Sequence, residues 1–89
     1  MENITKYRNE IDSIDKELIA LFERRMDIAR LIAEYKKENA MEIFHPGREE
    51  DVLNKCIADL HNKDYEEYVV ELVKDIMDIS KKFQFNTIK

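Results

Sequence analysis

The sequence is poor in residues that end helices or cross-link chains. It has one glycine, one proline and one cysteine among 89 residues, and no tryptophan. With so few turn-forming residues and 39% charged residues, the composition is typical of long helices rather than of many short elements. A single cysteine excludes an intramolecular disulfide, and no cysteines or histidines stand at zinc-ligand spacing. No stretch alternates apolar and polar residues at period two, so strands are not expected.

Long hydrophobic runs and an excess of positive charge are also missing. No run approaches 18 apolar residues, and the charged N-terminus lacks the apolar segment of a signal peptide, so neither a membrane span nor a leader is predicted. The net charge of −5 argues against nucleic acids and anionic membranes as partners, so a cationic site would have to be local. We therefore expect one cytoplasmic domain over residues 1–89.

Apolar residues dominate one face of the first third of the chain. Between Ile4 and Tyr35 they recur at alternating steps of three and four, as in a heptad seam. This pattern predicts a helix from about Asn3 or Thr5 to about Glu38, roughly 50 Å long at 1.5 Å per residue. A chain of this size cannot cover such a helix alone. A second copy of the chain is therefore the expected cover.

The segment "ENAMEIFHPGREED" ends this pattern and contains the only proline and glycine, which predicts the main loop. Apolar spacing then predicts a second helix over roughly Arg48 to Asn62. A third helix follows from about Tyr65 to Phe83 or Phe85, with Asp64 as its N-cap. The expected fold is all-α, with a long, a short and a medium helix.

Charged residues interrupt or border the apolar seam of the first helix. Arg25 occupies a core position, where an unpaired buried charge would cost several kcal/mol. It is either a seam arginine that reaches solvent or a glutamate, or an anion-binding arginine in a cavity. Lys36 lies three turns later on the same face, about 16 Å along the axis. Arg8 borders the seam about 25 Å before Arg25, so it could reach such a site only in an antiparallel partner.

Polar residues also stand out in the other two predicted helices. Ser80 and Gln84 continue the apolar line of the third helix, where they need hydrogen-bond partners if buried or lie in water if the helix frays. Glu49, near the start of the second helix, suits the positive end of the helix dipole, whereas Arg48 does not. Taken singly, each of these residues also fits an ordinary structural or solvated position. No nucleophile–base pair is evident.

Their order along the chain is more informative than any one of them. The first helix carries "KYRNEID" with Arg8, "LFERRMDIA" with Arg25, and "AEYKKEN" with Lys36. The remaining motifs are "HPGREE", with Arg48 and Glu49, and "DISKKFQF", with Ser80 and Gln84. Together they resemble the all-α class of chorismate mutase over nearly the whole chain. One departure is His45, where that family often has an aspartate that shapes the loop near the substrate hydroxyl.

The resemblance implies an intertwined homodimer of three helices per chain, in which each of two sites borrows Arg8 from the other chain. It implies an isomerase of aromatic amino acid biosynthesis that converts chorismate to prephenate without a cofactor or metal. Arg8, Arg25 and Arg48 would clamp the carboxylates with help from Ser80. Lys36 and Gln84 would donate to the ether oxygen, and Glu49 would accept from the hydroxyl. An isochorismate pyruvate lyase of the same fold and a non-catalytic dimerisation or regulatory module are the alternatives.

Overall fold

The computed structural model describes residues 2–88 and is built from helices alone. These are α1 (Glu2–Glu38), α2 (Pro46–Asp59), a short 3-10 helix η1 (Lys63–Tyr65) and α3 (Glu66–Thr87). Within the described residues there is no strand. The expected all-α fold, with a long, a short and a medium helix, is therefore confirmed.

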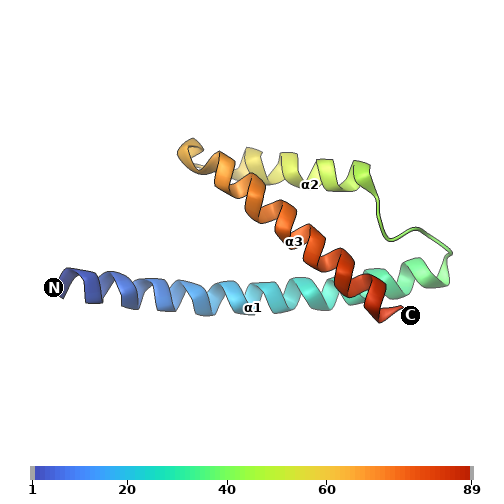
Figure 1. Ribbon diagram of the computed structural model, residues 1–89, viewed down its shortest axis with the longest axis horizontal. Coiled ribbons are helices and arrows are strands. Elements are labelled where there is room, and N and C mark those ends of the chain that lie inside the picture. Colours follow the sequence, from blue (N-terminus) through green and yellow to red (C-terminus); the bar gives the residue numbers. More distant parts are fainter. Residues whose placement is uncertain (1, 89) are drawn as a thin grey trace.

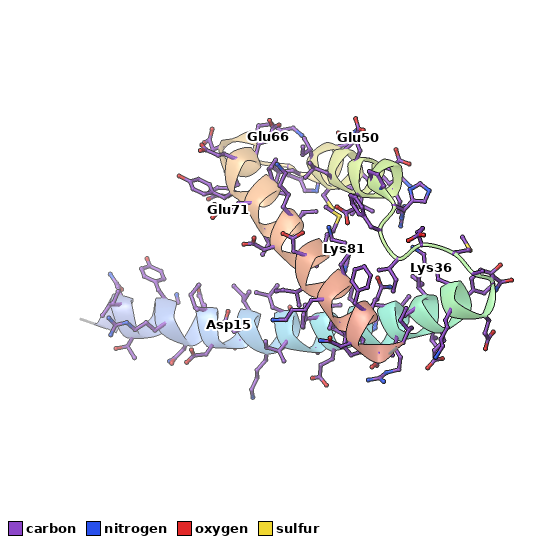
Figure 2. All side chains as sticks on the ribbon, turned by 45° about the vertical axis from the view of Figure 1, so that its right-hand side comes forward. Asp15, Lys36, Glu50, Glu66, Glu71 and Lys81 are labelled. Carbon is purple, nitrogen blue, oxygen red and sulfur yellow. The ribbon has the colours of Figure 1, made fainter. Side chains whose placement is uncertain are left out.

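Helix α3 holds the fold together by packing against both other helices (Figure 1). It runs across the C-terminal half of α1, while α2 returns beside α3 after the long loop. The N-terminal end of α1 projects beyond α2 and α3 (Figure 1), and Asp15 lies on this helix below the start of α3 (Figure 2). The resulting shape is elongated, with extents of 56 × 25 × 16 Å.

The buried core is small and includes residues of α1, α3 and the loop. Its apolar members are Ala29 and Ala33 of α1, Val73 and Met77 of α3, and Ile43 of the loop. Alanine side chains on α1 allow the two helices to approach closely at the crossing. By contrast, every residue from 3 to 21 is exposed, including the apolar seam of α1. The first half of the longest helix therefore has no cover within one chain.

The end of α1 is set by a hydrogen-bonded reversal of the backbone. Ala40 adopts a positive φ of 53°, a conformation usually taken by glycine. The amide of Ala40 donates to the carbonyl of Lys37, and that of Met41 donates to the carbonyl of Lys36. These two bonds form a Schellman motif, which satisfies the last carbonyls of α1 and turns the chain into the loop.

The limits of the other helices differ from the sequence prediction. Helix α2 begins at Pro46 rather than Arg48, because the His45 side chain caps it and proline suits the first turn. It ends at Asp59 rather than near Asn62. The prediction that Asp64 caps the third helix is wrong.

The third helix begins and ends differently from the prediction. Asn62 caps the intervening 3-10 turn, and α3 follows Tyr65 with no side-chain cap. Helix α3 also continues to Thr87, past the expected end at Phe83 or Phe85. The start of α3 follows a short 3-10 turn that is capped by a side chain, and the apolar spacing does not reveal this turn.

Candidate functional site

A pocket of about 300 Å³ lies between the C-terminal half of α1, the loop, the start of α2 and the C-terminal half of α3. Six of the seven site residues predicted from sequence line it: Arg25, Lys36, Arg48, Glu49, Ser80 and Gln84. Apolar walls are supplied by Ile28, Ala29, Ile32, Ile43, Val52 and Met77, and two further polar side chains, His45 and Lys81, complete the lining. Residues of α1, the loop, the start of α2 and the C-terminal half of α3 thus meet in one cavity.

Arg25 reaches across the pocket from α1 to α3. Its Nη1 donates to Oγ of Ser80 at 2.7 Å, and Ser80 is only 8% exposed. Arg25 therefore lines a cavity, as the second of the two interpretations of its place in the seam predicts. Ser80 is buried and partnered, so it does not belong to a frayed, wet helix end. Because its oxygen accepts from Arg25, its own hydroxyl proton remains available to donate to a ligand.

Gln84 lies one helical turn after Ser80 and is equally buried, at 8% exposure. Its Nε2 donates to the backbone carbonyl of Ala29 at 2.9 Å. A carbonyl partner requires the nitrogen of the amide on that side, which fixes the orientation of the group. The second hydrogen on the same nitrogen is left free. Gln84 is therefore a neutral, oriented donor on the pocket wall.

Lys36 lies in the last turn of α1, where the loop folds back over it (labelled in Figure 2). Its Nζ donates to the carbonyl of Ile43 at 2.8 Å, and Ile43 is buried. This bond uses one of the three ammonium donors and leaves two for a ligand. The loop therefore places the ammonium at the pocket instead of leaving it a freely solvated lysine.

The first turn of α2 brings His45, Arg48 and Glu49 to the same pocket. The Nδ1 atom of His45 accepts from the backbone amide of Arg48 at 2.9 Å, so in the neutral ring the proton is on Nε2. His45 is thus the N-cap of α2. Glu49 is half-buried, and one of its oxygens, Oε2, is paired with Lys81 at 3.0 Å.

The electrostatic character of the pocket is opposite to that of the whole chain. Four cationic side chains line it, those of Arg25, Lys36, Arg48 and Lys81, against the single carboxylate of Glu49. The chain as a whole carries a net charge of −5. Guanidinium groups bind carboxylates and phosphates through paired hydrogen bonds. The arrangement is therefore suited to a small, multiply charged anion.

Arg8 is the one predicted site residue that does not line this pocket. It lies on the exposed N-terminal half of α1, and seventeen residues of helix separate it from Arg25, about 25 Å along the axis. Within one chain the two guanidinium groups cannot contact the same small ligand.

Sequence reasoning missed Lys81, which lines the pocket beside Ser80 and one turn before Gln84. Its position next to two pocket residues was the available signal. In the sequence Lys81 stands beside Lys82, and two adjacent lysines on a helix are typical of a solvated face.

Comparison with known proteins identifies the family. The family model described as chorismate mutase type II matches residues 7–85. The chain belongs to the chorismate mutase type II family. The match includes Arg8 and all of the predicted pocket residues, so the resemblance seen in the sequence motifs is confirmed.

Two curated relatives share part of the sequence of this chorismate mutase type II domain. A T-protein from Haemophilus influenzae is 39% identical over 49 residues, which are 55% of this chain and 13% of that relative. A bifunctional chorismate mutase/prephenate dehydratase from Aquifex aeolicus is 35% identical over 57 residues, 64% of this chain and 16% of that relative. The chain therefore matches less than a fifth of the length of either relative. No solved structure matches it significantly.

Two kinds of feature are missing from residues 2–88. No group of three or more histidine, cysteine, aspartate or glutamate side chains is placed to hold a metal ion there. In the same part of the chain, no helix combines the length and apolarity needed to cross a membrane.

Proposed function

We propose that the protein is a chorismate mutase, an isomerase that rearranges chorismate to prephenate in aromatic amino acid biosynthesis. The observation that carries the proposal is one pocket in which Arg25, Lys36, Arg48, Ser80 and Gln84 converge as hydrogen-bond donors. Family membership supports the same reaction. At about 300 Å³ the pocket is of the size that small-molecule sites have.

The reaction explains why the site consists of donors rather than nucleophiles. In this Claisen rearrangement one C–O bond breaks as one C–C bond forms, so no proton needs to be transferred and no covalent intermediate arises. The enzyme has to hold a flexible dianion in a compact, chair-like conformation. It also has to stabilise the negative charge that develops on the ether oxygen.

The side chains of the pocket divide between these two tasks. Arg25 and Arg48 clamp the two carboxylates, because guanidinium forks match carboxylates geometrically, and the Ser80 hydroxyl adds a hydrogen bond. Lys36 and Gln84 donate to the ether oxygen through the donors that their contacts with Ile43 and Ala29 leave free. These last contacts become stronger as charge develops, which is the condition for lowering the barrier. Glu49 accepts a hydrogen bond from the ring hydroxyl.

We further propose an intertwined homodimer in which Arg8 of each chain completes the site of the other. Two features support it. The apolar seam of α1, which includes Ile4, Ile11 and Leu18, is exposed along the half of the helix that α2 and α3 leave uncovered. Arg8 lies about 25 Å from Arg25 along the same helix, a distance that antiparallel pairing of two α1 helices would offset.

The same proposal includes a single domain over residues 1–89 that works in the cytoplasm. The unpaired thiol of Cys56 supports a reducing compartment. The packing of α3 against both α1 and α2 supports a single domain.

The test is an absorbance assay for chorismate loss with prephenate identified as the product. Arg25→Ala is expected to lower kcat/KM on the order of 100-fold while the helical content persists, because the enzyme loses a charged clamp on the substrate. Arg24→Ala is the matched control: this neighbour is exposed and does not line the pocket, so it should retain activity. Full activity of Arg25→Ala would contradict the assigned role. Pyruvate release from isochorismate would indicate the lyase, and inactivity on both substrates would indicate a non-catalytic module.

A further inference from the structure

Lys81 connects three parts of the chain at the edge of the pocket (labelled in Figure 2). Its Nζ is 3.0 Å from Oε2 of Glu49 on α2 and 3.3 Å from Oδ1 of Asp78 on α3. The same ammonium lies 4.6 Å from the centre of the Phe44 ring in the loop. The Lys81 ammonium is therefore engaged by two carboxylates and an aromatic ring of the same chain.

Glu49 is the stronger of the two carboxylate partners. The Asp78 side chain is 70% exposed and belongs to the same helix, and such exposed pairs contribute little. The Glu49 side chain is 26% exposed and that of Lys81 25%, and their pair joins α2 to α3. The hydrogen bond to Glu49 is also the largest cause that raises the pKa of the Lys81 ammonium above its ordinary value of 10.5.

This pair leaves Glu49 with one fixed and one free oxygen. Oε2 is held by Lys81, whereas Oε1 has no hydrogen-bond partner among residues 2–88. A glutamate in the first turn of a helix otherwise has several accessible rotamers, and holding it in one of them lowers the entropy that substrate binding must remove.

We infer that Lys81 is a positioning residue: it anchors Oε2 of Glu49 so that Oε1 accepts the hydrogen bond of the substrate hydroxyl. The inference rests on the proposed function, since it deepens the role given to Glu49. It also explains how a lysine can line the pocket without serving as a further clamp for the dianion. Its charge is already engaged by Glu49 and by the face of the Phe44 ring.

The experiment is a kinetic double-mutant cycle on the full chain with chorismate as substrate. The four proteins are the wild type, Lys81→Met, Glu49→Gln and the double variant. Lys81→Met should lower kcat/KM roughly tenfold when Glu49 is present, but less than about twofold in the Glu49→Gln background. The difference lies within the range of coupling energies between residues in contact. Lys81→Arg should recover most of the loss, because a guanidinium can reach the same carboxylate.

Two control variants separate positioning from general effects of charge and stability. Lys82→Met removes the same charge one residue away, outside the pocket, and should leave kcat and KM unchanged. Asp78→Asn removes only the exposed partner and should also leave them unchanged. Thermal unfolding of each variant reports any loss of stability independently of the kinetics.

Several results would overturn the inference. An equal loss from Lys81→Met with and without Glu49 would mean that Lys81 contacts the substrate directly. A lower unfolding temperature with unchanged kcat and KM would mean that the pair only fastens α2 to α3. Both results require an active wild type, so they leave the proposed function intact, whereas an inactive wild type would refute that function and this role with it.

Discussion

Replacing Gln84 by glutamate tests whether this side chain acts as a hydrogen-bond donor. The substitution Gln84→Glu keeps the shape of the side chain but makes donation depend on protonation. The Ala29 carbonyl, which now accepts from Nε2 at 2.9 Å, would face a carboxyl group that is 8% exposed. Burial and the facing carbonyl both disfavour the ionised form, so the pKa of the introduced carboxyl should be raised.

The magnitude follows from the loss of one donor at the ether oxygen. At about pH 8 the ionised variant should have kcat/KM lower than wild type on the order of 100-fold, or about 3 kcal/mol in the barrier. As the pH falls, the ratio of variant to wild type should rise by up to roughly tenfold per pH unit until the carboxyl is protonated. Gln84→Ala has neither donor nor titration, so its ratio to wild type should stay low and flat.

Stability of the Gln84→Glu variant should change with pH in the same direction. A carboxyl whose pKa is higher in the folded than in the unfolded state binds more protons when folded. The free energy of unfolding should therefore fall as the pH rises from about 4.3, the unfolded value, to the folded pKa, by about 1.4 kcal/mol per unit of difference, and then level off. Urea unfolding across this window measures it.

One outcome would refute the reasoning about Gln84. If the ratio of variant to wild-type kcat/KM is the same at every pH, protonation of the side chain does not restore a donor. Gln84 would then act through its packing and its bond to Ala29 rather than on the reacting ether oxygen.

Two further predictions concern stability and assembly. Ala40→Gly should raise the free energy of unfolding, measured by urea titration, by about 0.5–1 kcal/mol. The reason is that glycine adopts the positive φ of 53° without the steric strain that a Cβ atom causes. An unchanged or lower free energy of unfolding would show that the Schellman turn carries no such strain. Ile14→Asp, on the exposed seam of α1, should shift the proposed dimer toward monomer in analytical ultracentrifugation and lower kcat/KM together with it. Lys16→Asp, on the opposite face of the same helix, is the control, and an unshifted mass for Ile14→Asp would contradict pairing through the seam.

Secondary structure was largely predictable because it depends on neighbours in sequence. The three-and-four spacing of apolar residues is a property of the α-helix itself, and it located α1 to within a few residues. Errors arose where one side chain or turn decided a limit. The His45 imidazole starts α2 two residues early, and the capped turn at Asn62 displaces the start of α3 past Asp64.

The candidate residues were also accessible from the sequence, since a charge or an amide on an apolar stripe conflicts with burial. Arg25 and Gln84 were found in this way. Lys81 was not, because on its own helix it is a lysine beside another lysine. Its importance arises only when α2 and α3 pack and Glu49 comes within 3.0 Å.

The sequence by itself determined the helices, the faces they present, and the set of donors suited to an anionic ligand, because periodicity and charge are local properties. Tertiary structure alone decided that Arg25 and Lys36 from the first helix, Arg48 from the second and Gln84 from the third enclose one pocket. It also decided which hydrogen atoms of these donors remain free, since Ser80, Ile43 and Ala29 engage some of them. Contacts across 55 residues of sequence, such as Arg25 with Ser80, depend on how α3 crosses α1, and the packing of the whole chain fixes that crossing.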